Sequence, residues 1–179
     1  MKSYSDFYKE ISADEVYEGL LGYGMFSEKI PPMFTSKPFY DYCKSNNPKF
    51  EDKWHSFVKY DSVRNTNIIR ELGIPTPMSY QQLCNCIKDN WPQLCNHFFQ
   101  CTNNQEYKVS RIHLRKMAKS PMIFKMNYDN WKEDGNPELD LLIGSKFLIH
   151  ADISKCFPSI YSHSLPWALV GKSEAKLTA

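Results

Sequence analysis

Long apolar runs are missing from this sequence: none approaches the roughly 18 consecutive apolar residues that a membrane-spanning helix needs. The N-terminal stretch MKSYSDFYKE lacks the apolar core of a signal peptide, so we expect a cytoplasmic protein without a membrane partner. An excess of charge is missing too, because 22 Lys and Arg balance 20 Asp and Glu, and a net charge of +2 says little about nucleic-acid binding. No internal repeat, low-complexity tract or obvious linker divides the chain.

The composition is sufficient for a folded core. Hydrophobic residues make up 42% of the 179 residues and aromatic residues 15%, which argues for a folded protein rather than a disordered tail. The length suits one ordinary domain or two small ones. Helical and strand patterns both occur along the chain, and we therefore expect an α+β fold.

Six cysteines raise the question of a metal site or disulfides. Four of them lie close in sequence to one histidine: Cys84, Cys86, Cys95, Cys101 and His97. However, Leu83, Ile87 and Trp91 recur at helical spacing through this region, and residues two apart on a helix point to nearly opposite sides. Cys84 and Cys86 are therefore not expected to share one zinc ion, and reduced thiols are the preferred interpretation.

Two helices are expected in the first part of the chain. Ser12, with Glu15 three residues later, forms a capping-box pattern that predicts a helix ending around the glycines of residues 19–24. Residues 29–39 carry three prolines and predict an irregular segment. A further helix is expected at 39–44.

A β-hairpin is expected next. β-branched residues flank Asn65 and Asn67, whose type tolerates turn conformations, so residues 57–77 predict a strand, a turn and a second strand. Ser79 is expected to cap the helix that follows, and Pro92 to interrupt or end it.

The second half of the chain predicts mixed elements. Residues 107–115 and 122–128 have the pattern of a pair of strands, and residues 139–143 that of a short helix ending at a glycine. Residues 147–151 are apolar and predict another strand. Pro158 suits the first turn of a helix.

Asp152 follows this last predicted strand directly. A carboxylate fixed at the end of a strand is suited to holding Mg²⁺, which prefers hard oxygen ligands, and the backbone of residues 153–156 offers further polar groups. The alternative is an aspartate that caps a helix, although Asp152 stands several residues ahead of Pro158. A phosphatase-type nucleophile is disfavoured because Ser154 occupies the position of the usual second aspartate.

The segment ADISKCFPSIYSHSLPWALVGK resembles the first catalytic palm motif of reverse transcriptases, in the form found in the bacterial abortive-infection (antiphage defence) group. The matching positions are Asp152, Phe157, Ile160 and His163. Three upstream stretches, GLLGYGMFSEKIPP, RNTNIIRELGIPTP and SRIHLRK, also look like blocks of that group. The resemblance covers nearly the whole chain.

This resemblance implies an incomplete right-hand polymerase. Residues 1–145 would form a fingers-like region with its hairpin near 57–75, and residues 146–179 would form the start of the palm. The implied activity is a nucleotidyltransferase that adds dNTPs to a DNA 3′ end by two-metal phosphoryl transfer, in antiviral defence by abortive infection. DNA or RNA would be further partners, and the full-length protein would form a homo-oligomer.

The resemblance also implies roles for single residues. Asp152 would be the first metal-binding and catalytic aspartate, with Mg²⁺ as cofactor or Mn²⁺ in its place. Phe157 would be the steric gate that favours dNTPs, and Ile153 would contact the nucleotide beside it. An aromatic ring at position 157 is also consistent with ordinary packing, which is the interpretation without the motif.

Basic residues complete the expected site. Arg64 and Arg70 stand where the family's hairpin grips the triphosphate, which suits the bidentate guanidinium fork; two solvated charges are the alternative. The block RIHLRKMAK holds five basic residues when its histidine is counted. Within it, Arg111, Arg115 and Lys116 would contact the nucleic-acid backbone, with a solvated strand edge as the alternative.

One family feature is missing from the sequence. The second metal-binding block, Tyr-x-Asp-Asp, has no counterpart, because no Asp-Asp pair occurs anywhere in the chain. One carboxylate does not hold two magnesium ions in catalytic geometry, and we expect these 179 residues alone to be inactive as a polymerase.

Two other functions remain open. A non-catalytic module would bind nucleic acid or nucleotides through the basic block with the nearby rings of Tyr107 and Phe124. A weaker alternative is a structural fragment that inhibits the oligomer of an intact protein. Asp152 discriminates between the first two functions, because a binding module would tolerate asparagine there and a polymerase would not.

Overall fold

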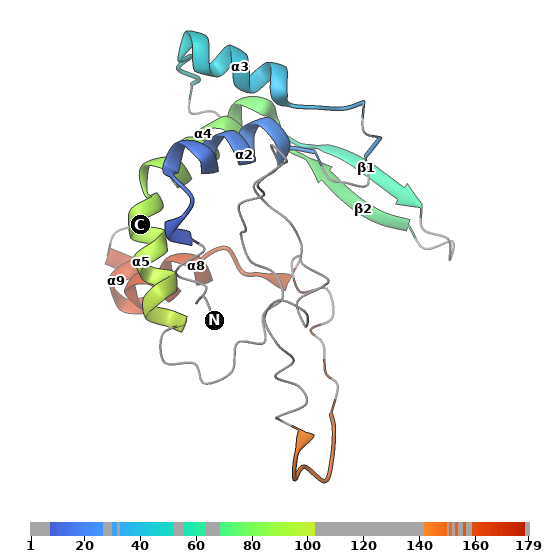
Figure 1. Ribbon diagram of the computed structural model, residues 1–179, viewed down its shortest axis with the longest axis vertical. Helices are drawn as coiled ribbons and strands as arrows, with labels where there is room; N and C mark the ends of the chain where they lie inside the picture. Colours follow the sequence, from blue (N-terminus) through green and yellow to red (C-terminus); the bar gives the residue numbers. More distant parts are fainter. Residues whose placement is uncertain are drawn as a thin grey trace. The chain divides into compact units, whose positions relative to one another are not determined.

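The computed structural model describes residues 8–26, 30–31, 33–51, 56–63, 69–102, 142–149, 151, 153, 156 and 159–177 (Figure 1). The chain divides into two units, Met1–Pro137 and Glu138–Ala179. The described residues form helices and one two-stranded antiparallel sheet, which confirms the α+β class.

Helix α2 (Ala13–Tyr23) begins at the predicted capping box. The Glu15 backbone N–H donates to Ser12 Oγ at 3.2 Å, and the Ser12 N–H donates to Glu15 Oε2 at 2.9 Å. The helix ends at Gly24, whose N–H donates to the Leu20 carbonyl at 2.8 Å. A Cβ atom at position 24 would lie 2.8 Å from that carbonyl oxygen, so the position requires glycine. The predicted helix is therefore confirmed at both ends.

Helix α3 (Lys37–Asn46) starts two residues before the predicted position. Pro38 occupies its first turn, where the missing N–H of proline leaves no intrahelical bond unmade. The helix ends at Asn47, which adopts the left-handed conformation with φ 42° that asparagine tolerates. The proline that favoured an irregular segment thus starts the helix.

The predicted hairpin is confirmed by strands β1 (Val58–Val63) and β2 (Ile69–Ile74). The strands are antiparallel, and their register runs from the pair Val58–Ile74 to the pair Val63–Ile69. The turn residues Asn65 and Asn67 lie outside the described residues.

Helices α4 (Pro77–Asp89) and α5 (Trp91–Thr102) follow the hairpin. The residue before α4 is Thr76, and Ser79 lies inside the helix, so the prediction that Ser79 caps it is wrong. Pro77 explains the earlier start, because a proline with fixed φ is preorganised for the first helical position. The predicted break before Pro92 is confirmed at Asn90.

Helix α2 packs against helices α3 and α4 (Figure 1), and two apolar clusters lie along it, the first shared with the start of α5 and the second with α3 and α4. The first is built on the buried residues Ile11, Val16 and Trp91, and the second on Leu21, Tyr40, Cys43 and Cys84. An ion pair of 2.7 Å between Lys88 Nζ and Asp14 Oδ1 joins α4 to α2 at the surface. The three helices therefore supply each other's buried surface, which is the main source of helix stability in proteins.

In the second unit, helices α8 (Ser164–Val170) and α9 (Lys172–Leu177) are separated by Gly171, which has φ 85°. Pro158 lies outside the described residues, so its expected place in the first turn of a helix stays a prediction; the next residue, Ser159, has 3₁₀-helical geometry, and α8 begins at Ser164.

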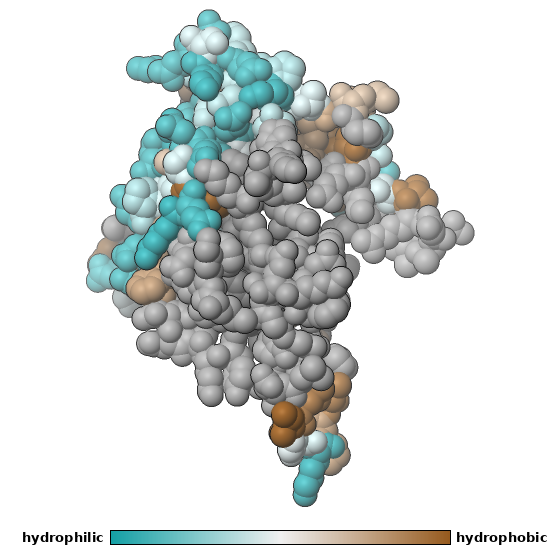
Figure 2. Space-filling view, in the orientation of Figure 1, coloured by the Kyte–Doolittle hydropathy of each residue, from teal (hydrophilic) through white to brown (hydrophobic). Residues whose placement is uncertain are grey.

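The predicted strand at 147–151 is also wrong in its described part. Residues 147–149 form no ladder within the described residues, and Phe147 and Ile149 are 86% and 85% exposed. Figure 2 shows hydrophobic side chains gathered over residues 142–149. An apolar run becomes a strand only when a partner supplies hydrogen bonds, and the segments predicted as strands at 107–115 and 122–128 lie outside the described residues.

The short helix predicted at 139–143 is described only at its end. Leu142 is helical, and the chain turns at Gly144, which has φ 79°. This left-handed conformation is the one expected of a glycine that ends a helix.

Candidate functional site

Most residues of the predicted polymerase site lie outside the described residues. They are Arg64, Arg111, Arg115, Lys116, Asp152 and Phe157. Their roles in binding metal, nucleotide and nucleic acid stay predictions, and so does the role of Mg²⁺. Among the described residues, no cluster of three His, Cys, Asp or Glu side chains is placed to hold a metal ion.

Arg70 lies on strand β2, as predicted, directly opposite Ser62. It is the second ladder residue after the turn, next to the terminal pair Val63–Ile69. The two-stranded ladder fixes the backbone at this position and so presents it close to the turn of the hairpin.

Ile153, the predicted neighbour of the nucleotide, is 69% exposed, and Cys156 lies in an exposed turn close by. Downstream, three aromatic rings contact one another. The ring centroids of Tyr161 and His163 are 5.0 Å apart, and those of Tyr161 and Trp167 are 5.5 Å apart. Lys172 Nζ lies 4.9 Å from the Trp167 ring centroid, a cation–π distance. The segment therefore presents exposed aromatic surface with a positive charge beside it.

The cysteines are free thiols, and their positions follow the helical interpretation. Cys84 is buried and Cys86 is exposed on the same helix α4, as expected for residues two apart. Burial raises the pKa of the Cys84 thiol to about 12, with the nearby Cys43 adding to the shift. Cys84 therefore stays a neutral thiol and packs as a small apolar side chain.

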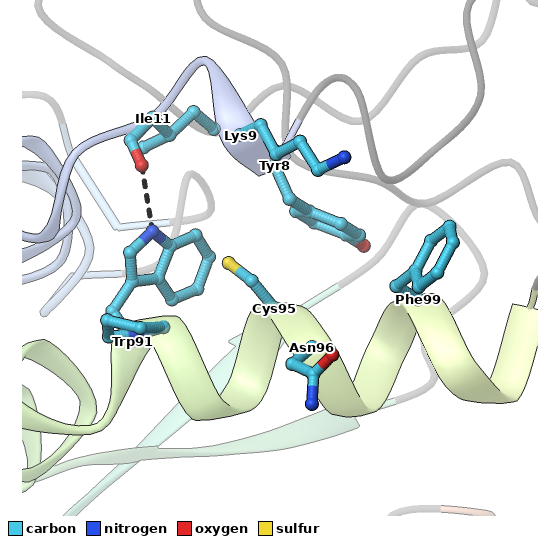
Figure 3. A pocket seen from close by; sticks show the side chains of 8 residues that line it. Tyr8, Lys9, Ile11, Trp91, Cys95, Asn96 and Phe99 are labelled. Atoms are coloured by element: carbon cyan, nitrogen blue, oxygen red, sulfur yellow. Dashed lines mark hydrogen bonds between the residues drawn. The ribbon is translucent and has the colours of Figure 1, made fainter.

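A pocket that sequence patterns did not predict lies between residues 8–11 and helix α5 (Figure 3), with a volume of about 500 Å³. Its walls are Tyr8, Lys9 and Ile11 on one side and Trp91, Pro92, Cys95, Asn96 and Phe99 on the other. In Figure 3, the side chains of Trp91, Cys95 and Phe99 rise from one face of α5 toward Tyr8 and Lys9. The four-residue spacing of these three residues was the available signal, because it places them on one helix face.

Hydrogen bonding and ring packing fix the shape of this pocket. The indole Nε1–H of Trp91 donates to the Ile11 carbonyl at 2.8 Å, a buried bond between residues far apart in sequence. The Tyr8 and Trp91 rings meet edge to face, with centroids 6.2 Å apart and an interplanar angle of 83°. Burial is the main cause that raises the pKa of Tyr8, so its hydroxyl stays protonated at neutral pH. Lys9 Nζ lies 5.5 Å from the Phe99 ring centroid.

Within the described part of the chain, no helix is long and apolar enough to cross a bilayer. In comparisons with known proteins, neither a protein-family model nor a curated protein matches this chain.

Proposed function

We propose that the chain is the fingers and the beginning of the palm of a reverse-transcriptase-like DNA polymerase that acts in phage defence. The observation that carries the proposal is the stretch ADISKCFPSIYSHSLPW, in which Asp152 and Phe157 have the order and spacing of the first palm motif. The β1–β2 hairpin is a second support, because it places Arg70 on strand β2 opposite Ser62, one residue from the end of the ladder, and Arg64 follows β1 directly in the sequence.

In this proposal Asp152 offers a hard carboxylate oxygen to Mg²⁺, and the donor type fits that ion. The bound ion would supply charge stabilisation for transfer of a nucleotidyl group. A single carboxylate does not complete a two-metal site, so the proposal requires further ligands besides Asp152.

The other residues act by binding and selection. The guanidinium groups of Arg64 and Arg70 bind triphosphate oxygens, since the planar fork donates two parallel hydrogen bonds. The ring of Phe157 fills the space that a ribose 2′-hydroxyl would need, which favours deoxynucleotides. Arg111, Arg115 and Lys116 neutralise backbone phosphates without reading the sequence.

The test is incorporation of labelled dNTPs by the product of the complete reading frame, with Mg²⁺ present. We expect incorporation by the unchanged protein and its loss in Asp152→Asn, which keeps the side-chain size but removes the charge. Asp89→Asn is the matched control, because Asp89 is an exposed carboxylate at the end of α4. Asp89→Asn should retain full activity.

Two results would contradict the proposal. One is an absence of incorporation with DNA, with RNA and without a template. The other is equal activity of Asp152→Asn and Asp89→Asn, which would remove Asp152 from the metal site.

A non-catalytic module that binds single-stranded nucleic acid is the second candidate. The exposed rings of Tyr161 and His163, with Trp167 and the Lys172 ammonium group beside them, favour it, because bases stack on such rings and phosphates pair with the cation. This candidate predicts binding to oligo-dT that weakens with salt and is unaffected by Asp152→Asn. Trp167→Ala should weaken that binding, whereas Trp91→Ala should not if the protein stays folded.

A further inference from the structure

We propose that the pocket between residues 8–11 and helix α5 binds a small molecule that carries an aromatic ring and an anionic group. This site is separate from the residues proposed for nucleotide transfer, and it rests on different observations.

The pocket walls fit a flat, apolar ring. Tyr8, Trp91 and Phe99 contribute three aromatic rings, and the volume of about 500 Å³ falls in the range of about 300–1,000 Å³ that is usual for ligand pockets. The one polar atom of the Trp91 side chain is already bonded to the Ile11 carbonyl, so its ring offers the pocket only apolar surface. An aromatic ligand gains both burial and ring–ring contact in such a space.

The charge of the walls selects an anion. Among the described residues that line the pocket, Lys9 is the only charged one, and none is a carboxylate. Within the described part of the chain, Lys9 contacts the Phe99 ring and forms no ion pair with Asp or Glu. Its ammonium group therefore lies at an aromatic wall with its hydrogen-bond donors available to a ligand. A carboxylate, sulfonate or phosphate on the ligand would complete the contact.

Chemistry on the ligand is not part of the proposal. Cys95 contributes a thiol to the lining, and burial raises the pKa of that thiol. A neutral thiol is a poor nucleophile, so the pocket is suited to reversible binding.

Three probes with the same ring system test the charge preference: naphthalene-2-sulfonate, neutral 2-naphthylmethanol and cationic 2-naphthylmethylammonium. Titration of the full 179-residue chain should follow the Trp91 indole N–H signal in ¹H–¹⁵N spectra. We expect the sulfonate to bind about fivefold more tightly than the alcohol, as for one partly exposed ion pair, and the ammonium to bind more weakly than either.

Two lysine variants distinguish an effect of the lysine in the pocket from a nonspecific effect of the protein's positive charge. Lys9→Met keeps the apolar stem and should abolish the difference between sulfonate and alcohol. Lys44→Met is the matched control, because Lys44 Nζ lies 5.6 Å from the Tyr40 ring centroid, much as Lys9 lies 5.5 Å from Phe99. Lys44→Met should leave all three affinities unchanged. Phe99→Ala should weaken the sulfonate and the alcohol alike, in a protein whose circular dichroism is unchanged.

Four outcomes would overturn the proposal. They are no binding of any probe, equal affinity for all three, equal effects of Lys9→Met and Lys44→Met, and a shift of the Trp167 indole signal with none at Trp91. The residues described as lining the pocket do not include Asp152, so Asp152→Asn should bind the three probes as the unchanged protein does. The outcome of the dNTP incorporation test therefore does not decide the outcome of the binding test.

Discussion

Helices α2–α5 and helices α8–α9 are all α-helices, but the two groups differ in how deeply their apolar side chains are buried. In the first group, Leu21 and Val16 are 0% and 1% exposed. In the second, Leu165 and Leu169 are 68% and 66% exposed, and Ala175 is the one buried residue described in α8 and α9. Apolar side chains thus support the first group from within, whereas those of the second face outward.

The buried side chains that stabilise the fold and the motif that suggests a function therefore lie in different parts of the chain. The helices with buried clusters carry the confirmed sequence patterns, namely the capping box, the hairpin that leads into α4 and the break before α5. The palm-like motif leads into α8, where the described side chains bury little surface. Truncating an apolar side chain should therefore lower the free energy of unfolding markedly in α2–α5 and little in α8–α9.

The largest effect is expected for Leu21→Ala. Leu21 is fully buried against Tyr40, Cys43 and Cys84, and removing its side chain leaves a cavity between three helices. We expect the free energy of unfolding to fall by about 2–5 kcal/mol, measured by urea denaturation with circular dichroism.

Leu169→Ala is the corresponding change in α8. Because Leu169 is exposed, the expected cost is about 0.5 kcal/mol or less. An equal loss of unfolding free energy in Leu21→Ala and Leu169→Ala would contradict the difference in burial, since it would mean that Leu169 is covered in solution.

The second effect compares two tryptophans. Trp91→Phe removes the donor to the Ile11 carbonyl and leaves that buried oxygen unpaired, so we expect a loss of about 1–3 kcal/mol. Within the described residues the Trp167 indole N–H has no such acceptor, and Trp167→Phe should cost about 0.5 kcal/mol or less. Thermal unfolding of both variants gives the comparison, and a larger loss for Trp167→Phe would contradict it.

The third effect concerns helix starts. Ser12→Ala removes one half of the capping box of α2 and should cost about 1 kcal/mol in urea denaturation. His163 precedes α8 without a side-chain capping bond, so His163→Ala should cost only a few tenths of a kcal/mol.

Ser36→Ala is the matched serine control. Ser36 precedes α3 without a capping bond, and its buried Oγ has no partner among the described residues. Removing an unpaired buried hydroxyl should be neutral or stabilising. If Ser36→Ala costs as much as Ser12→Ala, the capping box is not the source of the loss at α2.

Local signals were sufficient for much of the fold. Ser12 with Glu15 and Asn65 with Asn67 act within a few residues, and they predicted α2 and the hairpin. The predicted start of α4 at Ser79 is misplaced because proline at the first helical position, here Pro77, is the stronger geometric constraint. The strand predicted at 147–151 was wrong in its described residues, because an apolar run does not reveal whether a hydrogen-bonding partner is present.

The pocket could not be predicted from local patterns. The bond between Trp91 and Ile11 joins residues 80 positions apart, and Tyr8 reaches the same site from the N-terminal side of α2. The spacing of Trp91, Cys95 and Phe99 indicated a common helix face but not what lies opposite to it. For the residues of the proposed polymerase site, only the resemblance suggested roles, because helical or strand periodicity carries no information about them.

The smallest effect is a pH dependence at the surface of the first group. Glu18 on α2 accepts hydrogen bonds from Lys37 Nζ at 2.9 Å and from Tyr40 Oη at 3.2 Å. The bond from Lys37 is the main cause that lowers the pKa of Glu18. A lowered folded-state pKa contributes stability that is present above the unfolded value of about 4.3 and is lost as the pH falls through the folded-state pKa.

Glu18→Gln should therefore be less stable than the unchanged protein at pH 7, by about 0.2–1 kcal/mol because both partners are partly exposed. The difference should shrink as the pH falls below about 4, when the carboxyl group of the unchanged protein becomes protonated. Urea denaturation at pH 7 and pH 3 measures it. Lys37→Met should bring the pKa of Glu18 back toward its ordinary value in a ¹³C carboxyl titration; an unchanged pKa would mean that Lys37 does not hold the charge of Glu18.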